Sequence, residues 1–145
     1  MKRVLVSRCL LECCYRYDAK DVRVENIKEL LKNYEVIPIC PEVELLGLPV
    51  PRPRLKLVPV KGEIRLLKED TGEDLTEVLE KKSREFLEKV KPIHAAFLKS
   101  KSPSCGVKDA KVYKCLNCEE EVGRESGIFA KVLMEMFPDI PIITF

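Results

Sequence analysis

The sequence predicts an α/β fold. We expect a single domain over residues 1–145, with a three-layer, open, mainly parallel sheet of the Rossmann or flavodoxin-like kind and a small hairpin insertion. Short apolar runs alternate with amphipathic stretches along the chain, the pattern of strands and helices that follow one another in turn. The chain of 145 residues is 46% hydrophobic, which suffices for one hydrophobic core but not for two.

The first part of the chain predicts a strand, a helix and a second strand. Val4–Val6 is a short apolar run typical of a buried parallel strand. Asn26 and Glu29 have the spacing of a helix cap, and an apolar stripe follows them. Val36–Ile39 predicts the second strand. Because Pro38 lacks an N–H group, this strand is expected at an edge of the sheet or near its own end.

The middle of the chain predicts a hairpin and a long helix. Leu55–Val60 and Glu63–Leu67 are two apolar runs that flank Lys61 and Gly62, an arrangement typical of a tight turn between antiparallel strands. The apolar residues that follow share one helical face as far as Pro92, which ends the helix.

The last part of the chain predicts a strand, a loop, a helix and a final strand. Ile93–Leu98 is expected to be the third core strand, and a long loop follows it. Gly127–Phe137 predicts a helix that is apolar nearly all round and therefore buried. Pro141–Phe145 then completes the sheet.

Charge and hydropathy limit the partners and the location. The net charge of +2 gives no field to attract nucleic acid or anionic lipid, so direct nucleic-acid binding is not expected. No apolar run has the length of a membrane span or of a signal peptide, so we expect a cytoplasmic location and no membrane contact. In a cytoplasmic protein, seven cysteines indicate metal binding or catalysis more often than disulfides. The sequence indicates no particular oligomeric state.

Three of the cysteines follow predicted core strands. Cys9, Cys40 and Cys105 each lie just beyond the carboxyl end of such a strand. Because the carboxyl ends of parallel strands share one edge of a sheet, the three thiols are expected to converge. They would suit a three-thiolate metal site with an open position; the alternative is three small buried residues that fill strand ends.

Polar residues near these cysteines are candidates for the same site. Glu42 follows Cys40 by two residues and is a candidate general acid or base, or a carboxylate that caps backbone N–H groups. Ser102 and Ser104 flank Pro103 and are candidates for substrate binding, or for closing the turn.

Arg16, Asp18 and Arg52 are further candidates for substrate binding. Arg16 and Asp18 lie in the loop after Cys9, where the alternative is a structural ion pair. Arg52 lies in a proline-rich segment, where the alternative is a solvated arm.

Five motifs occur in order along the chain: Ser7-Arg8-Cys9-Leu10-Leu11, Arg16-Tyr17-Asp18, Cys40-Pro41-Glu42, Gly47-Leu48-Pro49-Val50-Pro51-Arg52 and Ser102-Pro103-Ser104-Cys105-Gly106. Together they resemble the thiouracil desulfurase family, and the resemblance covers the whole chain. It implies a 4Fe–4S cluster held by Cys9, Cys40 and Cys105. It further implies that Glu42 and Ser102 act on a small thiolated nucleobase such as a thiouracil. The implied reaction is a non-redox desulfuration, in which the sulfur of the substrate is transferred to the open iron of the cluster.

The remaining cysteines depart from the family pattern. After Leu11, where the family usually has a glycine, this chain has Glu12, Cys13 and Cys14, and further on Cys115 and Cys118 form a C-x-x-C motif. These four thiols predict a zinc site, a disulfide between the two loops, or uncommitted thiols. Two other functions therefore remain open: a zinc- or disulfide-stabilised binding module without catalysis, and a dithiol redox protein that uses Cys115 and Cys118.

Overall fold

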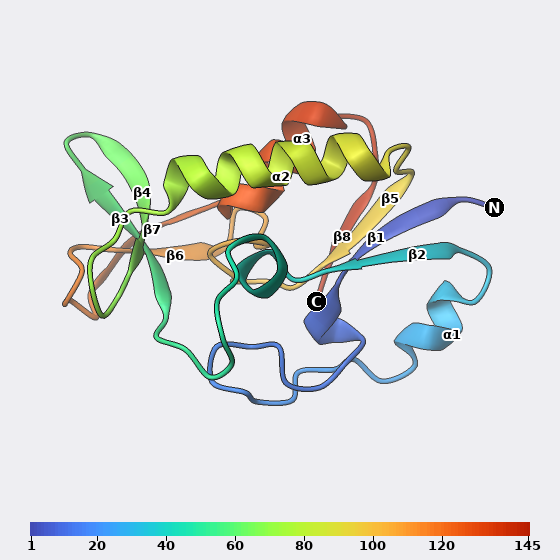
Figure 1. The fold of residues 1–145 in the computed structure, drawn as a ribbon, viewed down its shortest axis with the longest axis horizontal. Coiled ribbons are helices and arrows are strands. Elements are labelled where there is room, and N and C mark those ends of the chain that lie inside the picture. Colours follow the sequence, from blue (N-terminus) through green and yellow to red (C-terminus); the bar gives the residue numbers. More distant parts are fainter.

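A computed structural model describes residues 1–145, and its strands form two four-stranded sheets (Figure 1). Sheet A has the order β2-β1-β5-β8 and contains β1 (Arg3–Ser7), β2 (Glu35–Ile39), β5 (Ala95–Leu98) and β8 (Ile142–Thr144). Sheet B has the order β4-β3-β6-β7 and contains β3 (Leu55–Val60), β4 (Glu63–Lys68), β6 (Ala110–Tyr113) and β7 (Glu121–Glu125). The helices are α1 (Ile27–Leu31), α2 (Thr76–Val90) and α3 (Ile128–Met136), with two short turns of helix, η1 (Arg8–Leu10) and η2 (Pro41–Leu45).

Sheet A is the predicted parallel sheet, and every strand pair in it is parallel. Its central strand β1 is buried on both faces, as a sheet covered by helices on each side requires. On one face Leu5 packs in a core with residues of α2 and α3, and on the other Val4 and Val6 pack with residues of α1. The predicted three-layer α/β fold is therefore confirmed, and β2 lies at an edge as Pro38 indicated.

Sheet B is larger than the predicted hairpin insertion. The hairpin is formed as expected, with Lys61 and Gly62 both at positive φ in the turn between β3 and β4. However, β6 pairs with β3, and β7 pairs with β6, so the segment expected to be a loop supplies two more strands. Four residues of β7 are exposed, so it lacks the apolar alternation by which a strand is predicted from sequence.

Helix α2 connects the cores of the two sheets. Its residue Leu79 is buried in the core of sheet B, and Leu87 is buried in the core of sheet A. In Figure 1, α2 correspondingly runs from the end of the β3–β4 hairpin across to the strands of sheet A. No helix of the chain is both long enough and apolar enough to cross a membrane.

Helix α1 begins directly after Asn26 as predicted, but the predicted side-chain cap is not formed. Asn26 precedes the helix in a left-handed conformation (φ 63°), and its side chain makes no capping hydrogen bond. The helix is only five residues long and is held by Ile27 and Leu31, which are buried against β1. Packing of these two side chains, and not the expected cap, therefore holds the helix in place.

A cysteine-lined candidate active site

Three strands of sheet A deliver their following residues to one edge of the sheet. β1 leads directly into η1, which contains Cys9, and β2 leads into Cys40 and η2. β5 leads into the loop Lys99–Gly106, which contains Cys105. Because all three strands are parallel, these cysteines meet, and together they line a cavity of about 220 Å³. The structure thus brings together the three thiols that follow predicted strands.

The three cysteines are also the only free thiols of the chain. Burial, to which the neighbouring Cys40 thiol adds and which Lys99 opposes, raises the pKa of Cys9 to about 11. Burial raises the pKa of Cys105 to about 12, with Cys9 and Cys40 adding to the effect, and burial raises the pKa of Cys40 as well. Each thiolate therefore opposes the ionisation of the others unless a nearby positive charge compensates.

These thiols fit a metal cluster better than a single metal ion. Nowhere in the chain do three His, Cys, Asp or Glu side chains stand close enough together to hold one ion. In an iron–sulfur cluster each cysteine binds a different iron, so the sulfur atoms are spread around the cofactor. Three free thiols around one cavity match that requirement, and the positive charge of iron would stabilise the thiolates that burial disfavours.

Glu42 lies in the wall of the same cavity and is held by Arg52. The Nε and Nη2 atoms of Arg52 donate to Oε1 of Glu42 at 3.0 and 2.9 Å, and both side chains are buried. Arg52 also donates to the backbone oxygens of Tyr15 and Pro49. Arg52, which was expected to bind substrate, is therefore buried and holds the Glu42 carboxylate in place. The alternative prediction, that Arg52 lies in a solvent-exposed segment, is wrong.

Two serine hydroxyls extend this network from Glu42 toward Cys105. Ser104 donates to Oε2 of Glu42 at 3.2 Å, and the hydroxyls of Ser102 and Ser104 lie 3.0 Å apart. The Ser102 hydroxyl accepts from the backbone N–H groups of Ser104 and Cys105. Since the Ser104 proton is directed at Glu42, the Ser102 proton points to Ser104. The result is a directional chain from Ser102 through Ser104 to Glu42.

Helix α3 fixes the position of the loop that carries these serines. Backbone N–H groups of Ile128 and Ala130, at the start of α3, donate to the backbone oxygens of Pro103 and Ser104. Gly127, just before the helix, approaches so closely that a Cβ atom there would lie 2.4 Å from the backbone carbon of Ser104. The loop and the helix therefore contact each other backbone to backbone, which only glycine at position 127 permits.

Arg16 and Asp18 separate in the structure. Arg16 lines the cavity, with its guanidinium stacked over the ring of Tyr17. Asp18 does not line it, because its carboxylate turns toward Arg16 and Lys20 and caps the backbone N–H of Lys20. Asp18 thus forms the ion pair on the loop that was the alternative to substrate binding.

Several cavity residues were not predicted from the sequence. They are Ser7, Arg8, Tyr15, Tyr17, Lys99 and Lys101. Ser7 and Lys99 follow the same logic as the cysteines, because they occupy the ends of β1 and β5. The two tyrosines lie on a long loop whose path no local pattern indicates.

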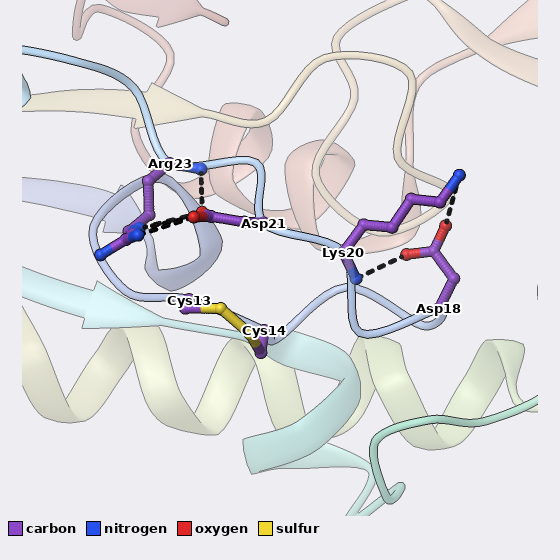
Figure 2. Close-up of a disulfide and its surroundings, with 6 residues drawn as sticks. All are labelled: Cys13, Cys14, Asp18, Lys20, Asp21 and Arg23. Atoms are coloured by element: carbon purple, nitrogen blue, oxygen red, sulfur yellow. Dashed lines mark hydrogen bonds and ion pairs between the residues drawn. A yellow bond between two sulfur atoms is a disulfide. The ribbon is translucent and has the colours of Figure 1, made fainter.

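The four other cysteines form two separate disulfides, Cys13–Cys14 and Cys115–Cys118. Figure 2 shows the first of them. The first lies in the loop after η1, and the second lies between β6 and β7 of the other sheet. The expected zinc site and the expected disulfide between the loops are therefore not formed, because the loops belong to different sheets. Cys115–Cys118 also lacks a following helix, which a thioredoxin-like dithiol would have.

An α/β protein with three free thiols and a buried carboxylate around one cavity, at the carboxyl edge of a parallel sheet, has the site of a cysteine-ligated cofactor enzyme. Comparison with known proteins defines the class further. Residues 4–144 match the family described as 2-thiouracil desulfurase. The chain belongs to this family, which confirms the resemblance seen in its motifs and makes it an enzyme of the desulfurase class.

Two individual proteins are similar over most of the chain. The uncharacterised protein YbbK of Bacillus subtilis (strain 168) is 34% identical over 112 residues, which are 71% of this chain and 72% of YbbK. A solved structure of the [4Fe-4S]-dependent thiouracil desulfidase TudS superposes with a TM-score of 0.74 at 27% identity, covering 99% of this chain and 91% of TudS.

Proposed function

We propose that this chain desulfurates a small thiolated nucleobase such as thiouracil, with a 4Fe–4S cluster held by Cys9, Cys40 and Cys105. The observation that carries the proposal is that the three free thiols of the chain line one cavity. The family match and the likeness to a [4Fe-4S]-dependent thiouracil desulfidase support it. When bound, such a cluster supplies an iron without a protein ligand, a Lewis acid with affinity for a thiocarbonyl sulfur.

Glu42 acts as the general base in this proposal. Its Oε1 atom is engaged by two bonds from Arg52, while Oε2 accepts only the Ser104 hydroxyl and keeps a lone pair for a proton. Oε2 takes this proton from a water molecule, whose oxygen bonds to the ring carbon that carries the sulfur. The second proton of the water passes to the sulfur, the carbon–sulfur bond breaks, and the sulfur leaves as hydrosulfide. The carbon becomes a carbonyl with no change of oxidation state.

Ser102 binds the heterocycle as a hydrogen-bond donor. Its oxygen already accepts two backbone N–H groups, so its proton is the part of this hydroxyl that can turn from Ser104 to a substrate. Ser104 remains bonded to Glu42, and Arg52 keeps that carboxylate in place. Arg16 lies in the cavity wall and offers a further donor to the substrate, whereas Asp18 would act only through Arg16.

The size of the cavity supports a small-molecule substrate. The cavity of about 220 Å³ has to hold the proposed cluster as well as the substrate, so we expect a free small molecule and no direct contact with nucleic acid. We also propose that residues 1–145 act as one domain, because α2 is shared by the cores of both sheets. A cytoplasmic location fits a cofactor that needs three reduced thiols.

The test is anaerobic reconstitution with iron and sulfide, followed by measurement of uracil formed from 2-thiouracil. We expect brown protein with visible absorption, and uracil formation that depends on it. The triple variant Cys9→Ser, Cys40→Ser, Cys105→Ser should bind no cluster. The matched control Cys115→Ser, Cys118→Ser removes two cysteines of sheet B and should bind iron normally. Normal iron and sulfide content in the triple variant would contradict the proposal.

A further inference from the structure

The Cys13–Cys14 disulfide lies on a loop whose residues on either side of it line the cysteine-lined cavity. Arg8 and Cys9 before it, and Tyr15, Arg16 and Tyr17 after it, all line that cavity. The loop is held there by Arg52, whose guanidinium donates to the Tyr15 oxygen and whose N–H donates to the Tyr17 oxygen. Figure 2 shows the disulfide on this loop, with the Asp18–Lys20 and Asp21–Arg23 contacts further along it. The disulfide is thus tethered on both sides to the cavity wall.

This disulfide is open to attack from solution. Both Cys13 and Cys14 are exposed, and no hydrogen bond engages either side chain. Exposed disulfides exchange readily with sulfur nucleophiles, and disulfides in cytosolic proteins are usually chemically active and seldom structural. The Cys13–Cys14 bond joins adjacent residues and therefore closes no loop of chain, so it has no evident role in holding the fold.

The charges of the cavity attract anions to the side on which the loop with the Cys13–Cys14 disulfide lies. Its charged lining consists of five cations and a single carboxylate, Glu42, which is already paired with Arg52. Lys99 donates only to backbone oxygens, and Arg16 has its nearest carboxylate oxygen at 3.7 Å. An anion released in the cavity is therefore held near Arg16, two residues from Cys14.

We propose that the Cys13–Cys14 disulfide captures the abstracted sulfur as a cysteine persulfide. Hydrosulfide attacks the Sγ atom of one of the two cysteines and forms a new sulfur–sulfur bond. The Cys13–Cys14 bond breaks, and the other cysteine leaves as a thiolate. The electrons balance, because the disulfide that is consumed is replaced by the persulfide, and no further oxidant is needed. In the cell, the hydrosulfide for this step comes from the proposed function. The exchange reaction itself can also take place with sulfide from any other source.

The second disulfide is the natural comparison. Cys115–Cys118 lies in sheet B, and its loop is engaged through the backbone oxygens of Leu116 and Cys118, which accept from the buried ammonium of Lys56. Unlike Cys14, which is followed directly by the lining residue Tyr15, neither Cys115 nor Cys118 has a neighbour in the chain that lines the cavity. It should therefore receive little sulfur that is released there.

The first experiment adds sodium sulfide to the purified protein, traps the products with an alkylating agent and digests the chain after Glu12 and Glu25. This cleavage separates Cys13 and Cys14 from Cys9. We expect the Cys13–Cys14 peptide to gain the mass of one alkylated persulfide, and the double variant Cys13→Ser, Cys14→Ser to gain none. A wild-type peptide without added sulfur, or one in which both thiols are free as purified, overturns the proposal.

The second experiment supplies 2-thiouracil with isotopically labelled sulfur to the reconstituted enzyme in a single turnover. We expect labelled sulfur on the Cys13–Cys14 peptide in excess of the Cys115–Cys118 peptide. The double variant Cys13→Ser, Cys14→Ser should form uracil normally and release all of the label as free hydrosulfide. Equal labelling of both disulfides overturns the proposal. Absence of uracil refutes the proposed function alone, because the sulfide experiment tests capture independently.

Discussion

Arg52 donates two hydrogen bonds to one carboxylate oxygen of Glu42, so that the other oxygen faces Ser104 and the cavity. Both side chains are buried, and the guanidinium of Arg52 also donates to the backbone oxygens of Tyr15 and Pro49. One guanidinium therefore connects η2, the proline-rich segment and the loop after η1. The orientation of the proposed base depends on this contact.

Replacement of Arg52 should destabilise the fold strongly. Arg52→Ala leaves a buried carboxylate without its partner, and removal of one member of a buried ion pair costs about 3–5 kcal/mol. The matched control is Arg84→Ala, which breaks an exposed pair with Glu135 and should cost roughly 0–1 kcal/mol. Urea unfolding of both variants measures the difference. If the free energy of unfolding fell equally in both variants, the Glu42–Arg52 pair would contribute no more to stability than an exposed ion pair.

Gly127→Ala should disturb the site through the backbone. The added methyl group would lie 2.4 Å from the Ser104 carbon and 2.6 Å from its oxygen, so the loop must move away from α3. Overpacking of this kind costs roughly 1–3 kcal/mol. Gly123→Ala is the control, since nothing lies within 4 Å of a Cβ atom there. Thermal unfolding and iron content should both fall in the first variant and stay at the wild-type level in the second.

Glu42→Gln should separate cofactor binding from catalysis. The amide keeps the shape of the side chain but is a poor proton acceptor, so we expect kcat to fall by roughly 10²–10⁴-fold. Iron and sulfide content should be retained, because the proposed cluster is held by the three free thiols and not by Glu42. Glu80→Gln, on the exposed face of α2, is the control and should leave kcat unchanged. A wild-type kcat in Glu42→Gln would assign the base to another group.

Acid should weaken sheet B through Glu69. Hydrogen bonds from Arg54 and then Lys56 hold the pKa of Glu69 below its usual range, although burial raises it, and Glu119 shares the same two partners. A depressed pKa in the folded state means that Glu69 stabilises the fold above its unfolded pKa, and that this contribution is lost as the pH falls through the folded pKa. The difference in unfolding free energy between the wild type and Glu69→Gln should therefore shrink from neutral pH toward pH 3. A difference independent of pH would contradict the ion pair.

Sheet A and its three cysteines could be predicted because their signals are local. The strands that precede Cys9, Cys40 and Cys105 are short apolar runs, and parallel topology then determines that their carboxyl ends meet. By contrast, β6 has only four residues and β7 is mostly exposed, and the pairing of β6 with β3 is a long-range event. The alternation of buried and exposed residues in β6 is too short for a strand to be predicted from it.

The support of Glu42 could not be predicted for a similar reason. Arg52 reaches the carboxylate because the proline-rich segment turns back toward η2, and its alternating prolines indicate stiffness but no direction. The pairing of the four other cysteines likewise depended on which loops come near each other. Residue types therefore indicate the chemistry of the site. The contacts that support Glu42 and the pairing of the four other cysteines depend on the three-dimensional fold.

The dispersal of Cys9, Cys40 and Cys105 over three strands sets the order of maturation. In a zinc finger, closely spaced ligands let the metal drive folding. Here β1 must first pair with β2 and β5 before the thiols meet, so an unfolded chain offers iron no preassembled site. We therefore expect the newly made protein to fold first and to receive the proposed cluster afterwards. The sheet would then be the template for the cluster, and a shortage of iron would lower activity without hindering folding.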